Sequence, residues 1–329
     1  MFSCSPVCDR MRRVFTPRRL REAFFSMNAF VRNLSFLSAL GVVVLTVAII
    51  AVLGASAAPA FKAFGWTFFV SEAWNPVKDV FGALPAIYGT LMTSFLALLF
   101  ALPISFGIAF FLVELSPPLL VKPLRVAIEL LAGIPSIVFG FWGLFVLAPV
   151  FQAHIQPFLI GTLGTLPLIG RFFEGPAFGI GILTAGVVLA IMILPFLTAF
   201  LTEVFKTVSP LLKESAHALG ATRWEVFRSI VTPSTRSSIA GGIMLALGRA
   251  LGETMAVTFV IGNFHKLKLS LLAPGTSISA SIANEFNEAT TDLHSASLLA
   301  LGLTLFAITF IVLACGKASV ALLARRSRS

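Results

Sequence analysis

The sequence has few charged residues and almost no tyrosine. Asp, Glu, Lys and Arg make up 12% of its 329 residues, well below the ~25% that is usual for soluble domains. A single tyrosine stands against 33 phenylalanines, and 57% of all residues are hydrophobic. These proportions exclude a soluble globular domain. They predict an all-α polytopic membrane protein with room for six transmembrane helices and modest loops.

Cysteine and histidine are scarce as well, with three and four copies. Cys4 and Cys8 lie in the polar N-terminal segment without a nearby histidine, and Cys315 ends an apolar stretch. Neither a disulfide framework nor a zinc site is therefore expected. The histidines are scattered through predicted loops, at His154, His217, His265 and His294. We predict no metal site.

Motifs for nucleotide binding and for hydrolysis are missing. No phosphate-binding loop G-x-x-x-x-G-K-[ST] occurs, because the one Gly-Lys pair, Gly316-Lys317, precedes Ala318 at the end of an apolar stretch. Neither H-E-x-x-H nor G-x-S-x-G is present, and only one carboxylate, Glu253, falls near the middle of a predicted span. The chain is predicted to be a non-enzyme that binds no cofactor itself.

The positive charge follows a membrane pattern rather than a nucleic-acid pattern. The net charge is +10, but the basic residues flank apolar stretches. Of the 24 Lys and Arg residues, 18 fall in segments on one predicted side of the membrane and five on the other. The positive-inside rule then places both termini in the cytosol. The basic leader is about thirty residues long, too long for a secretory signal, so the first apolar stretch is expected to remain as a helix.

Turn residues and charges divide the chain into six predicted spans. We expect a basic cytosolic segment at 1–33, a first transmembrane helix at 34–58, an extracytoplasmic segment at 59–84, a membrane core at 85–318 and a basic cytosolic tail at 319–329. Within the core, spans are predicted at 85–113, 126–150, 176–201, 238–262 and 295–317, with the longest charged loop at 202–237. Pro135 and the glycines around it predict a kinked or closely packed third span.

The predicted fifth span carries two opposite charges near its middle. Arg249 and Glu253 are four residues apart, so on a continuous helix they share one face. A charge at bilayer depth costs at least ~2.5–3.5 kcal/mol, so both are expected to face protein or water. Small residues on this helix permit close packing, at Gly241, Gly242, Ala246, Gly248 and Gly252. Two interpretations stay open: the pair lines a pathway, or it is an ion pair that fixes helix packing.

The charged loop at 202–237 predicts a helical hairpin. Ser209-Pro210 is a typical helix start, and Gly220 ends that helix. Thr222 and Glu225 then form a predicted capping box for a second helix. An apolar stripe continues the pattern at three-residue spacing, with Trp224, Phe227 and Ile230. Such a stripe either packs on the chain's own spans or docks into a partner.

The loop reads ESAHALG at 214–220 and, nine residues further on, IVTP at 230–233. This pattern resembles the EAA loop of ABC importer permeases, E-A-A-x-x-x-G, nine residues, I-x-L-P. Ser215 and Thr232 depart from it without adding bulk or charge. In that family the loop forms coupling helices that sit in a groove of a separate ATPase. The resemblance implies this role for Glu214, Ala216, Gly220, Ile230 and Pro233, with Trp224 and Phe227 on the stripe between them.

Further stretches resemble the phosphate-specific ABC permeases. They include FGALPAIYGTL (81–91), IPSIVFGFWGLFVLAPVF (134–151), GRALGETMAVTFVIGN (248–263) and SISASIANEFNEA (277–289). The ETMAV and ANEF stretches favour the PstC type of permease over its PstA partner. The resemblance covers about residues 75–318 and implies the ABC transporter type I permease fold. It also implies a phosphate importer with a second permease of the PstA type, an ATPase dimer that binds ATP and Mg²⁺, and an extracytoplasmic phosphate-binding protein.

Phosphate as substrate leads to a specific hypothesis for the charged pair. Arg249 is the only Lys or Arg placed inside a predicted span, and its planar fork suits two phosphate oxygens. In this hypothesis Glu253 holds Arg249 at rest and keeps the phosphate contact weak enough for release. The alternative substrates are sulfate and molybdate. A secondary transporter or channel would also tolerate charged spans, but it needs no coupling loop. The stretches 59–84 and 263–294 either dock the binding protein or brace the outer mouth.

Overall fold

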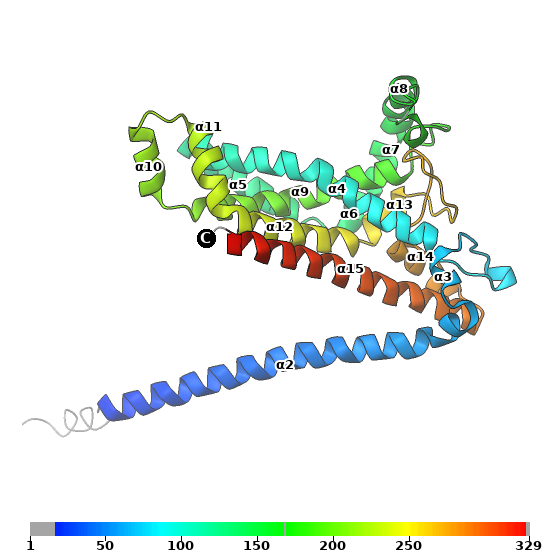
Figure 1. Cartoon of the computed structure of the whole chain (residues 1–329), viewed down its shortest axis with the longest axis horizontal. Coiled ribbons are helices and arrows are strands. Elements are labelled where there is room, and N and C mark those ends of the chain that lie inside the picture. Colours follow the sequence, from blue (N-terminus) through cyan, green and yellow to red (C-terminus); the bar gives the residue numbers. More distant parts are fainter. Residues whose placement is uncertain (1–16, 168, 327–329) are drawn as a thin grey trace, which may run out of the picture. The chain divides into compact units, whose positions relative to one another are not determined.

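The computed structural model describes residues 17–167 and 169–326, and every regular element in this part of the chain is a helix (Figure 1). An isolated antiparallel bridge between Asn75 and Val80 is the one extended pairing found there. The chain divides into two compact units, the first ending at Ala55 and the second beginning at Ser56. The all-α fold class predicted from composition is confirmed.

Helix α2 (Pro17–Phe64) makes up the described part of the first unit and reaches into the second. Its stretch Val31–Phe64 is long and apolar enough to cross a membrane, and it contains the span predicted at 34–58. The helix runs on through Pro59, so the first turns of the predicted extracytoplasmic segment are helical. Membrane helices tolerate proline where neighbouring groups satisfy the freed backbone carbonyl.

The second unit is a helical bundle. Its elements are α3 (Thr67–Val70), η1 (Pro76–Lys78), α4 (Leu84–Phe110), η2 (Phe111–Leu115), α5 (Pro118–Ala132), α6 (Ser136–Trp142), η3 (Gly143–Leu147), α7 (Ala148–Val150), η4 (Phe151–Ile155), α8 (Gln156–Thr162), η5 (Gly170–Phe172), α9 (Ile182–Lys206), α10 (Pro210–Ala218), α11 (Arg223–Val226), η6 (Phe227–Val231), α12 (Thr232–Leu251), α13 (Met255–Val260), α14 (Ile278–Glu285), η7 (Phe286–Glu288) and α15 (Asp292–Arg326). We call the end of the bundle that carries α10 and α11 the α10 end, and the opposite end the α14 end.

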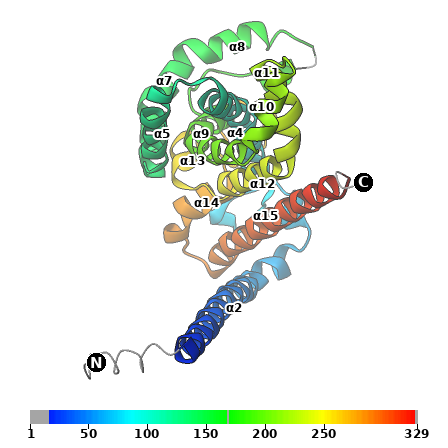
Figure 2. The same cartoon turned by 90° about the vertical axis from the view of Figure 1, so that its left-hand side faces the viewer.

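Helix α9 lies at the centre of the bundle. It packs along α4 and also contacts α5, α12 and α13, which surround it in the end-on view (Figure 2). Its apolar stretch is 72% buried, against 33% for α4 and 22% for α15. Leu189, Ile193, Leu197 and Leu201 recur every fourth residue and are fully buried. A stripe at this spacing covers one side of a helix, so α9 is the hydrophobic centre on which the other helices pack.

The predicted third span is divided into two helical stretches. Helix α5 ends at Ala132, Gly133–Pro135 separate it from the next helix, and Ser136–Thr162 are then helical with π-turns. Pro135 has no N–H to donate and disfavours helical backbone in the residue before it, which explains the break. The predicted span 126–150 therefore has a break where a kink was predicted. The helix also extends into 151–175, which was predicted as a loop.

The predicted fourth span starts later than the sequence suggested. Helix α9 begins at Ile182 rather than near residue 176. Gly175 and Gly179 have φ values of +116° and +79°, a region that a helix cannot use and that side chains disfavour. Residues 175–181 (GPAFGIG) thus form a non-helical loop that precedes α9 in the sequence.

Five helical segments of the described part are long and apolar enough to span a membrane. They are Val31–Phe64, Leu84–Leu115, Ser136–Thr162, Ile182–Lys206 and Asp292–Ala318. The predicted span 238–262 is not among them, because its helix is interrupted.

At the α14 end, the stretch predicted as an outer loop is largely packed into the bundle. Residues 270–273 and 275–281 are buried, and Ile278 of α14 lies in one core cluster with Phe81 and Leu298. Gly89 of α4 lies so close to Thr276 that any side chain at this position would clash with the Thr276 carbonyl. This finding favours bracing over free exposure for the middle of 263–294.

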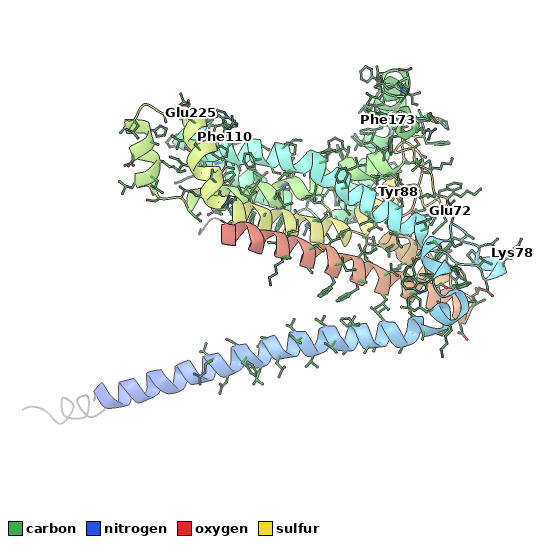
Figure 3. All side chains as sticks on the ribbon, in the orientation of Figure 1. Glu72, Lys78, Tyr88, Phe110, Phe173 and Glu225 are labelled. Carbon is green, nitrogen blue, oxygen red and sulfur yellow. The ribbon has the colours of Figure 1, made fainter. Side chains whose placement is uncertain are left out.

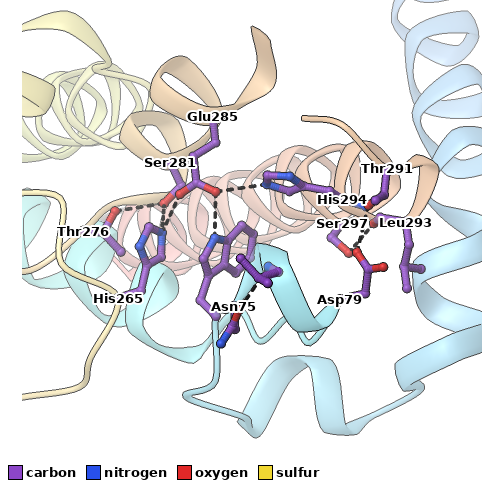
Figure 4. Close-up of polar contacts among 12 residues, drawn as sticks. Asn75, Asp79, His265, Thr276, Ser281, Glu285, Thr291, Leu293, His294 and Ser297 are labelled. Atoms are coloured by element: carbon purple, nitrogen blue, oxygen red, sulfur yellow. Dashed lines mark hydrogen bonds and ion pairs between the residues drawn. The ribbon is translucent and has the colours of Figure 1, made fainter. Parts of the chain in front are cut away.

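A polar cluster ties this packed stretch to its neighbours (Figure 4). Glu285 accepts a hydrogen bond from Trp74 Nε1 at 2.7 Å and lies 3.0 Å from His294 Nε2 and 3.3 Å from His265 Nε2. The ring of Trp74 stacks on His265 with centroids 5.0 Å apart. Burial lowers the pKa of His265, and the nearby Glu285 carboxylate partly offsets that effect. One carboxylate thus joins three separate segments of the chain.

Candidate functional site

The first candidate site is the interruption of the predicted fifth span. Helix α12 ends at Leu251, residues 252–254 are not helical, and α13 starts at Met255. The stretch 238–262 is therefore not one continuous helix, as the sequence had suggested. Two side chains stabilise the break. Glu253 Oε1 accepts a hydrogen bond from the Ala256 N–H at 3.2 Å, at the start of α13. Ser279 Oγ donates to the Glu253 carbonyl at 2.7 Å.

Arg249 and Glu253 do not form the expected helical pair. The helix ends between them, and within the described part of the chain no ion pair or hydrogen bond joins them. Arg249 is exposed in the last turn of α12, where the helix dipole favours a positive charge. The carboxylate of Glu253 is half-buried and caps α13 instead. The arrangement therefore offers an available guanidinium beside a carboxylate that is already engaged.

The interruption lies next to the break in the third span. Helix α6 and the π-turn η3 that continues it pack tightly on α13: a Cβ at Gly140 would sit 3.1 Å from Ala256 Cα, and one at Gly143 would touch Val260. These two contacts advance in the same direction along both helices, so α6 and α13 run parallel from their respective breaks. In a membrane, broken helices occur only where protein or water satisfies the free backbone groups. The paired breaks are therefore candidate positions for substrate contact.

The small residues of α12 are used mainly for packing inside the chain. Gly242 lies against Phe200 of α9, and Gly248 contacts Leu313 of α15. Gly241 and Gly248 also line an open groove of about 810 Å³ between α9, α12 and α15, whose walls are almost entirely apolar. Gly242 and Gly248 thus serve contacts of α12 with its own neighbours.

The second candidate site is the hairpin formed by α10 and α11 (residues 209–226). Gly220 ends α10 with φ +89°, which favours glycine. The predicted capping box is present, because Thr222 Oγ1 accepts from the Glu225 N–H and Glu225 Oε2 accepts from the Thr222 N–H. The hydrogen bonds from the backbone N–H and hydroxyl of Thr222 lower the pKa of Glu225. The helix–glycine–helix prediction is confirmed.

The apolar stripe after the hairpin packs mainly on the chain's own spans. Phe227 is 1% exposed, and its ring lies 4.5 Å from that of Phe110 and 5.0 Å from that of Phe205. Ile230 is half-buried against the same core. Trp224 stays 53% exposed, although its ring meets Phe110 edge-on. Of the two alternatives for the stripe, packing on the chain's own spans therefore applies to Phe227 and Ile230. Docking into a partner stays a prediction for Trp224.

The exposed face of the hairpin contains leucines that sequence reasoning missed. Leu211, Leu212 and Leu219 are 71%, 53% and 91% exposed, and no residue of α10 is buried. Glu214 is also exposed, and Ala216 is half-buried. Helix α10 projects from the bundle, as Figures 1 and 3 show at their left edge. Exposed apolar side chains on a projecting helix are typical of a protein-binding surface. The Leu211-Leu212 pair, separated from the ESA motif only by Lys213, is the signal that could have revealed it.

The hairpin continues into the interrupted span without a loop. Helix α11, the π-turn η6 and α12 succeed one another directly, from Arg223 to Leu251. Pro233 is exposed and lies in the first turn of α12, directly after the π-turn η6, and its missing N–H fits the irregular hydrogen bonding there. Helix α11 of the hairpin and the last turn of α12, which carries Arg249, therefore belong to one uninterrupted helical rod.

Comparison with known proteins places this architecture. Among solved structures, a chain of a bacterial alginate ABC transporter, in complex with an alginate pentasaccharide-bound periplasmic protein, matches with a TM-score of 0.57 and 18% identity. The match covers 86% of this chain and 92% of that one. A chain of the MetNI methionine ABC transporter, in an inward-facing conformation, matches with a TM-score of 0.50 and 15% identity, covering 74% and 94%. These likenesses show the fold of an ABC importer permease.

Sequence relatives narrow the class to a family. The family model described as "Binding-protein-dependent transport system inner membrane component" matches residues 101–329. The phosphate transport system permease protein PstC of Mesorhizobium japonicum is 57% identical over 258 residues, which covers 78% of this chain and 79% of that protein. PstC of Xylella fastidiosa strain 9a5c is 58% identical over 262 residues, covering 80% and 81%. The chain belongs to the family of binding-protein-dependent transport system inner membrane components.

Proposed function

We propose that the chain is a permease subunit of an ATP-driven, binding-protein-dependent importer of inorganic phosphate. The substrate is supported by relatives more than half identical over most of both chains, which are named phosphate transport permeases. One structural observation carries the coupling role. The α10–α11 hairpin exposes Leu211 and Leu219 beside Glu214, and it continues without a loop into α12.

The proposed complex divides its tasks among several chains. A separate ATPase dimer binds ATP and Mg²⁺ and docks on the hairpin, so this chain hydrolyses nothing itself. A second permease completes the pathway, and an extracytoplasmic binding protein delivers phosphate. The α10 end then faces the cytosol of a bacterium, with both termini on that side of the inner membrane. The residues at the α14 end that a binding protein can reach lie in 263–269 and 283–288, where all but His265, Leu267 and Glu285 are exposed.

Within this function, Arg249 is the proposed contact for phosphate in the pathway. Its guanidinium is exposed at a break in the helix and makes no hydrogen bond or ion pair with any residue of the described part. Phosphate therefore need not displace a carboxylate from Arg249 in this conformation. Glu253 serves chiefly to hold the start of α13. The exchange in which Glu253 holds Arg249 at rest stays a prediction for another state of the transport cycle.

Uptake by the reconstituted complex tests the proposal. Proteoliposomes containing both permeases and the ATPase are supplied with the binding protein, ATP and labelled phosphate, with sulfate or molybdate as competitor. We expect uptake that needs ATP and binding protein and that excess sulfate leaves unchanged. Uptake suppressed equally by sulfate or molybdate would instead indicate a general oxyanion permease. ATP-independent uptake would point to a secondary transporter or channel.

A further inference from the structure

Glu114 lies where α4 meets the hairpin, in the π-turn η2 that extends α4 at the α10 end. Its carboxylate Oε1 lies 2.6 Å from Nζ of Lys213 on α10, and the two side chains are only 9% and 16% exposed. The backbone carbonyl of Glu114 also accepts a hydrogen bond from Arg223 Nη1 of α11 at 2.9 Å. A single residue at the end of α4 therefore holds both helices of the hairpin.

This attachment differs from the other ion pairs at the α10 end. Arg125 pairs with Glu129 and with Glu203 at 2.9 Å, but these three side chains are at least half exposed, so water and salt screen them. The Lys213–Glu114 pair is mostly buried. Within the described part of the chain, it is the one ion pair or hydrogen bond that joins α10 to an element outside the hairpin. Helix α10 has no buried residue that could hold it in another way.

Movement of the hairpin acts directly on this buried pair. Separating the pair loses a charge-assisted hydrogen bond that is largely shielded from water, and such bonds are stronger than neutral ones. A displaced α10 therefore tends to carry Glu114 with it rather than release it. The π-turn that contains Glu114 follows α4 directly, so no loop separates this residue from the span. Beyond that turn, α4 packs along α9 through the core of the bundle.

We propose that Glu114 is a positioning residue that transmits displacement of the hairpin to α4, in parallel with the direct route through η6 and α12. The inference rests on the proposed function, because it takes the hairpin to be the part that an ATPase moves. The hairpin then acts on two spans at once. Helix α12 is moved by chain continuity, and α4 is moved by the Lys213–Glu114 pair and by the hydrogen bond from Arg223.

The experiment measures coupling in the reconstituted complex. Glu114→Gln and Lys213→Met remove one charge each, Lys213→Arg keeps it, and Glu129→Gln removes a charge from an exposed pair as a control. For each variant, bound ATPase, phosphate uptake and ATP hydrolysis are measured together. We expect Glu114→Gln and Lys213→Met to bind the ATPase normally but to hydrolyse at least about fivefold more ATP per phosphate, the lower end of typical coupling effects. Lys213→Arg and Glu129→Gln should keep the wild-type ratio.

Several outcomes would overturn the inference. Glu114→Gln and Lys213→Met with the wild-type ratio would show that α4 needs no such link. If bound ATPase and phosphate uptake fall together, the Lys213–Glu114 pair only holds α10 in place and does not transmit its movement. A charge swap, Glu114→Lys with Lys213→Glu, should recover the ratio at least in part, and no recovery over Glu114→Lys alone would contradict the pairing. If the wild-type complex takes up no phosphate, the proposed substrate fails. In that case the coupling role of Glu114 can still be tested, by measuring how strongly the binding protein stimulates ATP hydrolysis in the Glu114 variants and in wild type.

Discussion

The segments at the two ends of the bundle are held in place by very different numbers of contacts. At the α14 end, residues 275–281 are buried, and Glu285 joins Trp74, His265 and His294 within 3.3 Å (Figure 4). At the α10 end, a helix without buried residues projects from the bundle and is held by one buried ion pair. A segment with many mutually supporting contacts opens rarely, whereas one with few can move at small cost. The α14 end is therefore built to stay in place and the α10 end to be moved.

The interrupted span is connected to both of these ends. Helix α12 belongs to the rod that starts in the hairpin, while Ser279 of the buried stretch at the α14 end donates a hydrogen bond to Glu253 at the break. A push on the hairpin thus meets a fixed point at residues 252–254. Displacement of the rod against that point changes the position of Arg249 relative to α13. Under the proposed function, this is where ATPase movement becomes a change in the pathway.

The largest effect should come from placing charge on the movable end. In Leu219→Glu combined with Leu211→Glu, two exposed apolar side chains of the hairpin become acidic, so the chain should fold normally while losing its ATPase. We expect a loss of uptake and co-purifying ATPase of tenfold or more, about the size of a hot-spot change. Val77→Glu is the matched control, since Val77 is 94% exposed in the segment between α3 and α4. Normal ATPase binding in the double variant would mean that the hairpin is not the docking surface.

Neutralising Arg249 tests the point between the two ends. Arg249→Gln removes the charge from an exposed side chain, so membrane abundance should stay normal. Losing a hydrogen bond to a charged partner costs ~1.5–3 kcal/mol, which corresponds to about a ten- to hundredfold reduction in uptake. Transport of labelled phosphate at matched abundance measures it. Reduced abundance in proportion to uptake would favour the packing interpretation instead.

A companion variant separates Glu253 from Arg249. Glu253→Gln keeps an oxygen that can accept the Ala256 N–H, whereas Glu253→Leu does not. If the side chain acts as a cap, Glu253→Gln retains most uptake and Glu253→Leu loses it. An equal loss of uptake in both variants would instead favour the hypothesis that the Glu253 carboxylate holds Arg249 at rest.

The sequence was most informative where local rules decide the structure. Gly220, Thr222 and Glu225 specify the hairpin through backbone conformation and capping, and the structure agrees with that prediction. Phe227 was ambiguous, because the same spacing suits a docking stripe or a core stripe, and only the neighbours Phe110 and Phe205 decide.

The errors come from long-range contacts that no local pattern records. The stretch 238–262 is apolar enough to read as one span, but Ser279, 26 residues after Glu253, stabilises the break by binding the carbonyl of Glu253. Likewise, Glu114 and Lys213 are 99 residues apart, so nothing in either segment indicated their pairing. The fold class and the hairpin were predictable from the sequence, whereas the attachment of each end was not.

A moderate effect is expected from loosening the fixed end. Trp74→Phe keeps an aromatic ring against His265 and Phe81 but removes the N–H that Glu285 accepts. Losing a hydrogen bond to a charged group costs ~1.5–3 kcal/mol, so thermal unfolding of the purified permease should occur a few degrees lower. The ATPase should still co-purify at the wild-type level. Loss of the ATPase without a change in thermal stability would contradict the division of roles between the ends.

The smallest predicted effect is a pH dependence confined to the α14 end. The folded structure lowers the pKa of His265, chiefly by burial, so protonation is less favourable in the folded chain than in the unfolded one. The resulting stability is complete above the ordinary histidine pKa of about 6.5 and is lost as the pH falls through the lowered pKa of the folded state. Glu285 is the titratable group that contacts this ring, it also contacts His294, and all three residues belong to the fixed end. His265→Gln should therefore flatten the decline in melting temperature between about pH 7 and pH 5. His217→Gln, in the exposed hairpin, should leave it unchanged, and equal flattening by both variants would show that the acid sensitivity does not arise in this cluster.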